Sequence, residues 1–406
     1  MKTAPITISD RAPRLDNGWE WVPLGDVAQL ATGHTPDRSV PGYWNGGIPW
    51  ISLTEIRDLD GRLADRTELS VSAEGIRHSS SVVLPAGTVC LSRTASIGFV
   101  TVMGTSMATS QDFVNWVCGP LLDPGYLMRA LIASRKHVRS LSTGSTHKTL
   151  YMRVAERFRV LLPPIEEQRR IAAILDKADE LRAKRRAALA QFDSLTQSIF
   201  LDMFGEPGAN RHDWPMRSIR SIATSAAYGT SEKASDAGPL AVLRMGNLSS
   251  TGRIDLNNLK YMKLSDREFE RYTVRRGDIL FNRTNSADLV GKTAVYREDG
   301  PMAFAGYLVR LRLAPDADPE YLGALLNTRW AKTILRAMCK SIVGMANINA
   351  NELQNIVVMV PPIDLQRKFA DITRAVLARN GIHESALACH DELFASLQHR
   401  AFSGAL

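Results

Sequence analysis

Two long stretches of the chain carry apolar residues at alternating spacings of three and four, which is typical of a helix packed along one face. The first stretch begins at Ile171 and the second at Phe369. The expected seam of the first is Ile171, Ile174, Ala178, Leu181, Arg185, Ala188, Phe192, Leu195 and Ile199. Because all but one of these positions are apolar, the pattern predicts a helix of about four heptads.

The second stretch has a more polar seam. Its expected positions are Phe369, Ile372, Val376, Arg379, His383, Ala386, His390, Leu393 and Leu397. Polar seam residues set the register of a helix pair at a cost in stability. Each helix would be roughly 55 to 60 Å long at 1.5 Å per residue. Since neither can bury its seam alone, we expect the two to pack as an antiparallel, pseudo-twofold coiled coil between two globular domains.

The remaining segments mix short β-branched runs with turns, which predicts an α+β fold with two similar α/β domains. The candidate strands are Val82–Leu84, Val89–Ser92, Phe99–Val102, Ile279–Asn282 and Ile356–Val360. The expected division is an N-terminal tail at 1–17, domains at 18–163 and 206–362, and spacer helices at 164–205 and 363–406.

The two halves of the chain repeat each other. Pro-Pro-Ile-x-x-Gln-Arg occurs at 163–169 and again at 361–367, in each case just before a long helical stretch. Asp123-Pro124 and Asp318-Pro319 both look like a helix cap followed by the first helical residue. A period near two hundred residues is far longer than that of a solenoid, so the repeating unit is a domain plus a helix.

Composition narrows the class of protein. The 406 residues carry a net charge of +8, which favours a polyanionic partner. The four cysteines are far apart and have no ligand-spaced histidine nearby, which argues against a zinc site and a disulfide framework. Neither end of the chain has the apolar run of a signal peptide or membrane span. We therefore expect a cytoplasmic protein with no membrane contact.

Three catalytic patterns are missing from the sequence. The chain has no Glu-x-Lys of the kind that a PD-(D/E)xK nuclease needs, and its Pro-Pro pairs lack the Asn/Asp-Pro-Pro-aromatic form of amino-methyltransferases. Gly291-Lys292-Thr293 resembles the end of a phosphate loop, but Ser286 stands where that loop requires its first glycine. His147 near Ser145 lacks any identifiable third catalytic partner. These absences favour a binding protein.

Side chains suited to nucleic acid follow the strand that both halves share. Arginine forks, hydroxyls and amides are the groups that contact phosphates and base edges. A repeated glycine later in each half indicates a second close approach of the backbone. The candidate DNA-contacting residues are Arg93, Thr94, Ser96, Gly144, Ser145, Thr146, His147, Lys148, Arg244, Asn247, Arg283, Thr284, Asn285, Ser286, Lys292, Gly344 and Asn347.

Taken together, these motifs resemble the specificity subunits of type I restriction-modification systems. The resemblance covers nearly the whole chain and is carried by Trp-Val-Pro-Leu-Gly-Asp-Val at 21–27, by the Arg-Thr strand in both halves, and by the Pro-Pro-Ile-x-x-Gln-Arg block. The second domain departs from it, because it opens less typically at Trp214.

The resemblance implies a non-catalytic subunit whose two domains each read one half of a bipartite site in double-stranded DNA. It implies that the helices set the spacer and dock two methyltransferase subunits, which two restriction subunits with translocase activity join. S-adenosylmethionine, ATP and magnesium would belong to those partners, with no cofactor in this chain. Two other hypotheses stay open: a single-chain restriction enzyme with degenerate motifs, and a helical scaffold that binds only protein.

Overall fold

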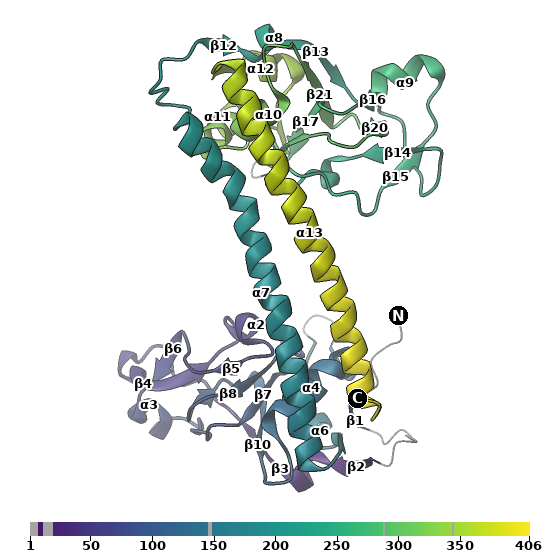
Figure 1. The fold of residues 1–406 in the computed structure, drawn as a ribbon. Coiled ribbons are helices and arrows are strands. Elements are labelled where there is room, and N and C mark those ends of the chain that lie inside the picture. Colours follow the sequence, from purple (N-terminus) through teal and green to yellow (C-terminus); the bar gives the residue numbers. More distant parts are fainter. Residues whose placement is uncertain (1–6, 11–18, 145–147, 287–288, 343–344) are drawn as a thin grey trace. The chain divides into compact units, whose positions relative to one another are not determined.

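The computed structural model describes residues 7–10, 19–144, 148–286, 289–342 and 345–406. It divides into two compact units. Unit 1 comprises Met1–Lys184 with Ala386–Leu406, and unit 2 comprises Arg185–Ser385. Both combine helices and sheets, so the predicted α+β class with two similar units and two long helices is confirmed (Figure 1).

In the part that the structure describes, unit 1 contains three sheets. Its central sheet has the order β3 (Ala28–Thr32), β10 (Phe113–Cys118), β7 (Val89–Ser92), β8 (Val100–Met103) and β5 (Leu63–Ala64). A second sheet has the order β1 (Ile8–Ser9), β11 (Arg159–Leu162) and β2 (Glu20–Pro23). The third has the order β6 (Leu69–Val71), β4 (Trp44–Ile51) and β9 (Ala108–Thr109).

Helices cover the unit 1 sheets and complete its core. They are α1 (Leu24–Val27), η1 (Pro41–Tyr43), α2 (Ile56–Leu59), α3 (Ala73–Arg77), α4 (Pro124–Ala133), α5 (Arg135–Ser140), α6 (Met152–Ala155) and the first half of α7 (Ile165–Phe204). The main core joins the central sheet to α4 and to both long helices, with Trp116, Leu127 and Phe402 fully or almost fully buried.

The described residues of unit 2 form four sheets. Its central sheet has the order β13 (Ala223–Tyr228), β21 (Leu308–Leu313), β17 (Ile279–Asn282) and β19 (Thr293–Val295). A mixed sheet has the order β15 (Lys260–Met262), β14 (Leu240–Leu243), β20 (Met302–Phe304) and β16 (Thr273–Val274). The smaller sheets are β12 (Met216–Ser218) with β24 (Val357–Met359), and β18 (Thr284–Asn285), β23 (Met345–Asn347) and β22 (Lys340–Ile342).

The helices of unit 2 follow a similar plan. They are α8 (Ile219–Ile222), η2 (Met245–Asn247), α9 (Asp266–Tyr272), α10 (Pro319–Leu326), α11 (Arg329–Met338), α12 (Ala350–Gln354) and most of α13 (Ile363–Phe402). Phe200, Phe204, Tyr321 and Phe369 form an aromatic cluster in its core, with ring centroids 4.8 to 5.7 Å apart.

The duplication read from the sequence is present in the strand register. Val89 pairs with Val102 in unit 1, and Ile279 pairs with Val295 in unit 2. The predicted strands at Val89–Ser92 and Ile279–Asn282 are confirmed in full, and those at Phe99–Val102 and Ile356–Val360 form with shifted ends. The predicted strand at Val82–Leu84 is wrong. Only Leu84 forms a bridge, to Met107, because Val82 and Val83 are exposed and have no ladder partner.

Both predicted helix caps are confirmed. The Asp123 carboxylate accepts a hydrogen bond from Tyr126 N at 2.9 Å, and the Asp318 carboxylate accepts one from Glu320 N at 2.8 Å. The proline that follows each acid occupies the first helical turn, where no amide hydrogen is needed.

The two long helices are each 40 residues long, and antiparallel contacts occur within each unit. In unit 1, Arg182 donates to Asp391 at 2.6 Å, while Arg170 donates to the Leu406 carbonyl at 3.1 Å. In unit 2, Arg185 Nη1 lies 2.6 Å from His383 Nδ1. Farther along that unit, the rings of Phe200 and Phe369 are 5.7 Å apart. Within each unit, residues later in α7 therefore contact residues earlier in α13, as in an antiparallel helix pair.

The predicted seam is only partly correct. Leu181, Leu195 and Leu393 keep 45%, 37% and 54% of their surface exposed, whereas Phe394 and Asn380 are buried. The seam therefore passes one residue later at these places. A helix with 3.6 residues per turn drifts about 20° per heptad from a strict repeat of 3.5, so the buried stripe gradually leaves the expected positions.

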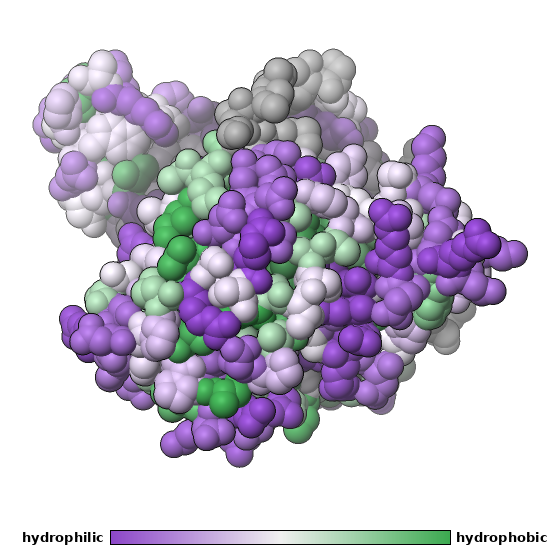
Figure 2. All heavy atoms as spheres, turned by 90° about the horizontal axis from the view of Figure 1, so that it is seen from above, coloured by the Kyte–Doolittle hydropathy of each residue, from purple (hydrophilic) through white to green (hydrophobic). Residues whose placement is uncertain are grey.

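The surface is mixed in character. On the face drawn in Figure 2, hydrophobic residues form small patches between hydrophilic ones. In the described part of the chain, no helix is long and apolar enough to cross a membrane.

Candidate nucleic-acid interface

The Arg-Thr motif of unit 1 opens a tight hairpin loop between β7 and β8. Ser92 N donates to Phe99 O at 2.9 Å, and Gly98 N donates to Ser92 O at 3.0 Å, which closes the loop around residues 93–97. Gly98 has a φ of +90°, and a Cβ there would lie 3.0 Å from the Arg135 side chain. A glycine is therefore needed for both the conformation and the close approach.

The second predicted cluster of unit 1 lies against this hairpin. Thr94 and Thr149 form an antiparallel bridge, and Leu150 N donates to Arg93 O at 2.8 Å. The Thr94 hydroxyl donates to Asp112 at 2.6 Å, and Arg93 Nε donates to the Gln111 carbonyl at 2.8 Å. The structure thus brings together two segments that are about fifty residues apart in sequence.

Basic side chains surround the tip of the unit 1 hairpin. A cavity of about 310 Å³ is lined by the following described residues: Arg57, Ala95, Ser96, Ile97, Phe99, Arg139, Ser142 and Lys148. Arg57 and Arg139 were missed by sequence reasoning. They come from α2 and α5, and no local pattern connects those helices with the hairpin.

Unit 2 repeats the arrangement with a longer loop. Asn282 N donates to Lys292 O and Gly291 N donates to Asn282 O, both at 2.8 Å. Strand β18 pairs with β23, so Thr284 lies opposite Asn347, and the two side chains are joined by a hydrogen bond of 3.0 Å. The predicted first and second clusters of this half therefore also meet.

Aromatic side chains accompany the unit 2 arginine. The guanidinium of Arg283 lies 4.9 Å from the ring centroid of Tyr228, whose hydroxyl accepts a hydrogen bond from Ala350 N at 2.8 Å. Tyr228 is 43% exposed, and Tyr307, whose backbone carbonyl accepts a hydrogen bond from Arg283 N at 3.0 Å, is 53% exposed. Both tyrosines were missed, because each lies in a segment far from the Arg-Thr motif in sequence.

A lysine supports the far end of the unit 2 loop. Lys332 Nζ, on α11, donates to the Gly291 carbonyl at 2.5 Å and to Asn327 Oδ1 at 2.9 Å. Burial, together with the nearby positive charges of Lys292 and Arg336, lowers the pKa of Lys332 to about 8. Arg139 has a similar place in unit 1, where it donates to the Ile97 carbonyl at 2.8 Å.

The other predicted residues have varied positions. Ser96, Gly144, Lys148, Asn285, Ser286 and Lys292 are at least partly exposed in the hairpin loops or beside them. Arg244 begins the turn at η2 and donates to the Asn258 carbonyl at 2.9 Å. Asn247 is buried, and its amide donates to Asp255 O at 2.9 Å, so it stabilises its own loop, while its contact with DNA stays a prediction. Ser145, Thr146, His147 and Gly344 lie outside the described residues.

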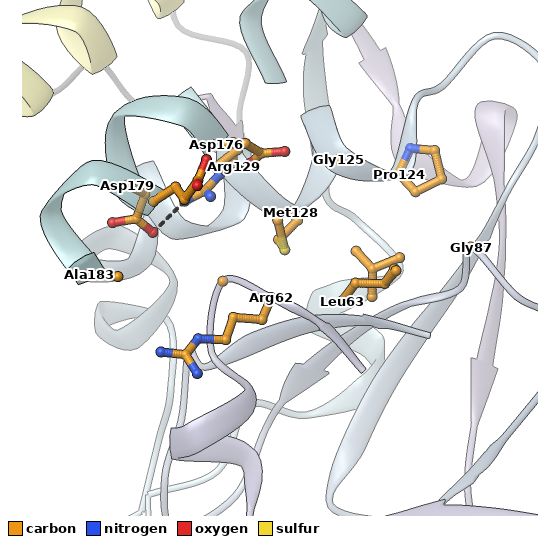
Figure 3. Close-up of a pocket in the computed structure, with 13 residues that line it drawn as sticks. Arg62, Leu63, Gly87, Pro124, Gly125, Met128, Arg129, Asp176, Asp179 and Ala183 are labelled. Atoms are coloured by element: carbon orange, nitrogen blue, oxygen red, sulfur yellow. Dashed lines mark hydrogen bonds and ion pairs between the residues drawn. The ribbon is translucent and has the colours of Figure 1, made fainter. Parts of the chain in front are cut away.

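A larger cavity in unit 1 lies between β8, α4 and α7. It has a volume of about 640 Å³, and Figure 3 shows Arg62, Leu63, Met128 and Arg129 around it. Arg129 is only 4% exposed and donates to Asp176 at 2.7 Å and Asp179 at 3.1 Å. Because these charges are paired with one another, the cluster anchors α7 to α4.

The matching place in unit 2 is filled. Only about 30 Å³ remains there, beside the turn at Thr251 and Gly252. Arg297 and Glu320 form two hydrogen bonds of 2.7 and 2.6 Å across it. In the described part of the chain, no group of three histidine, cysteine or acidic side chains is arranged to hold a metal ion.

One family model matches the N-terminal part of the chain. Residues 16–191 match the type I restriction modification DNA specificity domain. The chain is 25% identical to the EcoKI specificity subunit of Escherichia coli K12, and it is 23% identical to the StySPI specificity subunit of Salmonella potsdam. Each alignment covers 97% of this chain and 90% of the relative. These names agree with the expected resemblance to a specificity subunit.

Solved structures share the fold. The crystal structure of the type I restriction-modification system S subunit from M. genitalium matches with a TM-score of 0.60 and 13% identity over 97% of this chain and 98% of that one. A chain from a structural study of complex assembly in the type I system matches with a TM-score of 0.56 and 18% identity, over 97% and 100% of the two chains. The resemblance expected from the sequence is confirmed.

Proposed function

We propose that this chain, which belongs to the specificity subunits of type I restriction-modification systems, binds double-stranded DNA through the hairpin clusters of its two units. Each unit would read one half of a bipartite, asymmetric site. The observation that supports this proposal is the shared frame: each unit joins an Arg-Thr hairpin to a second loop by backbone hydrogen bonds.

Different side chains on a common frame favour two different half-sites over one palindrome. The unit 1 frame presents Thr94, Ser96 and Lys148, whereas the unit 2 frame presents Asn285, Ser286 and Asn347. Amides form paired hydrogen bonds with adenine, while hydroxyls and lysines are less selective. The two sets would therefore read different bases.

Mapping methylated adenines in the genome of a host strain tests this proposal. The expected result is a pair of unlike half-sites with a fixed spacer, lost when this chain is deleted. A methylation pattern that survives the deletion, or one continuous site without a spacer, would contradict it.

The long helices would set the spacer and dock two methyltransferase subunits, with two restriction subunits joining the complex. S-adenosylmethionine, ATP and magnesium would be bound by those partners. Four residues inserted between Ala188 and Leu189, and at the matching place between Ala386 and Leu387, would add about 6 Å to each helix. The preferred spacer should then lengthen while both half-sites stay the same. An unchanged spacer in a folded variant would contradict this role for the helices.

A further inference from the structure

The cavity at the tip of the unit 1 hairpin is lined by polar side chains that are either cationic or hydroxylic. Its described lining contains the three cations Arg57, Arg139 and Lys148, the hydroxyls of Ser96 and Ser142, and no carboxylate or side-chain amide. Charged donors and hydroxyls match a group that only accepts hydrogen bonds and carries negative charge. Guanine also presents only acceptors in the major groove, but it carries no negative charge, so a lining with three cations favours a phosphate over a base edge.

An aromatic ring gathers the guanidinium groups at this place. Arg57, Arg135 and Arg139 lie 5.8, 5.3 and 5.6 Å from the centroid of Phe99. The charge of Arg135 is balanced by Asp60, to which it donates at 2.7 and 2.8 Å. It therefore supports the ring contact without adding net charge to the cavity.

The other two guanidinium groups have neutral partners. Arg57 donates to the Ser96 hydroxyl at 3.3 Å, and Arg139 donates to the Ile97 carbonyl at 2.8 Å. Among the described residues, no ion pair involves Arg57, Arg139 or Lys148. Their positive charges thus remain available to an anion that enters the cavity.

The corresponding cation of unit 2, Lys332, is in a different environment. Lys332 directs its ammonium group at Gly291 O and Asn327 Oδ1, and burial disfavours its charge. That side chain supports the loop from within. The contrast indicates that the exposed cations of unit 1 do more than hold their hairpin.

We infer that the unit 1 cavity lined by Arg57, Ser96, Arg139, Ser142 and Lys148, called here the phosphate seat, binds one phosphate of the DNA backbone. This inference rests on the proposed function, because it requires duplex DNA at the unit 1 hairpin. A phosphate contact fixes the position of the duplex without reading sequence. The seat would therefore contribute affinity, while neighbouring side chains of the hairpin discriminate bases.

The first test uses the full chain assembled with its methyltransferase subunits. The double variant Arg57→Gln with Lys148→Gln removes two charges and leaves the Arg139 bond to the hairpin. Lys136→Gln, an exposed residue of α5 outside the seat, is the matched control. Affinity for target and unrelated DNA should fall alike, by about tenfold, and the slope of log K against log salt should flatten by about 0.9. The control should match the wild type.

A second test locates the phosphate. Single phosphates of the target duplex are replaced by neutral methylphosphonate, one position at a time. One replacement in the unit 1 half-site should weaken wild-type binding about tenfold and leave the double variant nearly unchanged. Equal losses in both proteins at every position would overturn the inference.

The remaining outcomes separate the inference from the proposed function. A loss of discrimination at one base pair in the double variant would show that the seat reads a base. Saturable binding of inorganic triphosphate by the wild type alone, with unaltered DNA affinity in the variant, would assign the seat to a free anion. Either result would contradict the inference that the seat binds a backbone phosphate, but it would leave the proposed function intact as long as the wild type binds its target DNA selectively. Failure of the wild-type complex to prefer any duplex would contradict the proposed function itself.

Discussion

The two units share their internal hydrogen bonds more closely than their exposed loops. Gln168 and Gln366 are both fully buried, and each side-chain oxygen accepts from the capping aspartate backbone at 2.9 Å. Tyr126 and Tyr321 both donate to a carbonyl of the strand before the long helix, at 2.6 and 2.8 Å. The repeated motif thus joins strand, cap and helix in the same way twice.

The hairpin loops of the two units differ, although the strand, cap and long helix are joined in the same way in both. The unit 1 loop closes over residues 93–97 and is surrounded by exposed cations, whereas the unit 2 loop closes over 283–290 and is supported by a buried lysine. Backbone hydrogen bonds fix where each loop begins and ends, and they leave the side chains at its tip free to vary. Under the proposed function, affinity and base discrimination would therefore be distributed unequally between the two units.

Replacing the buried glutamine should have the largest effect. Gln168→Leu leaves Asp123 N, Leu121 O and Pro163 O without their partner, whereas Gln366→Leu leaves Asp318 N and Pro361 O. Each buried group without a partner costs about 1–3 kcal/mol. We expect losses of about 4 kcal/mol in unit 1 and about 3 kcal/mol in unit 2, measured by amide hydrogen exchange resolved for each unit.

The control for this experiment is Glu166→Gln, on the exposed side of the same helical turn. It should change stability by less than about 0.5 kcal/mol. If either glutamine variant were as stable as this control, the shared frame would not depend on the motif.

Most of the frame could be predicted from the sequence. The strands at Val89–Ser92 and Ile279–Asn282, the caps at Asp123 and Asp318, and the two long helices follow from local patterns and from the repeat. The helix seam could be predicted only in part, because Leu393 is exposed where Phe394 is buried. A heptad count does not include the drift of a real helix.

The site was less predictable than the frame. The sequence predicted two clusters of candidate residues in each half, but it did not predict that the two clusters contact each other. That contact, such as the bridge from Thr94 to Thr149, depends on tertiary packing. No sequence pattern indicated that Arg57 or Tyr228 lies at the site, because each comes from an element that is distant in sequence from the Arg-Thr motif. Burial could not be predicted either, since Asn247 has an amide suited to base contacts and yet is buried within its own turn.

Replacing the arginine of each Arg-Thr motif tests whether each unit binds its own half-site. Arg93→Ala and Arg283→Ala should each weaken binding by about 1–3 kcal/mol, with the effect confined to the half-site of its own unit. Competition with duplexes altered in one half-site at a time measures this. Equal sensitivity of both half-sites to either variant would show that the arginines do not act locally.

A pH experiment distinguishes the cations that support the hairpins. The folded pKa of Lys332, about 8, is below its ordinary value of 10.5, so the unfolded chain binds more protons between these pH values. Stability from this group therefore rises as the pH increases from about 8 to 10.5. Relative to Lys332→Met, the wild type should gain about 1–2 kcal/mol between pH 7.5 and pH 10 in urea unfolding.

The matched control for the pH experiment is Arg139→Met in unit 1. An arginine stays charged throughout this range, so its difference from the wild type should not change with pH. A constant difference for Lys332→Met as well would mean that its ammonium is not destabilised by burial.

The smallest expected effect concerns the backbone of the unit 1 hairpin. Ala95 has a φ of +46°, a left-handed conformation that costs a residue with a Cβ roughly 1–2 kcal/mol. Ala95→Gly removes that cost and adds freedom to the unfolded chain, which offsets roughly 0.4–1 kcal/mol of the gain. Unit 1 should therefore become more stable by about 0.5 kcal/mol, as measured by urea unfolding. Ala86→Gly, in a turn where φ is not positive, should instead destabilise it by a similar amount. If both variants were destabilised alike, the hairpin of unit 1 would store no strain, and its difference from unit 2 would lie in side chains alone.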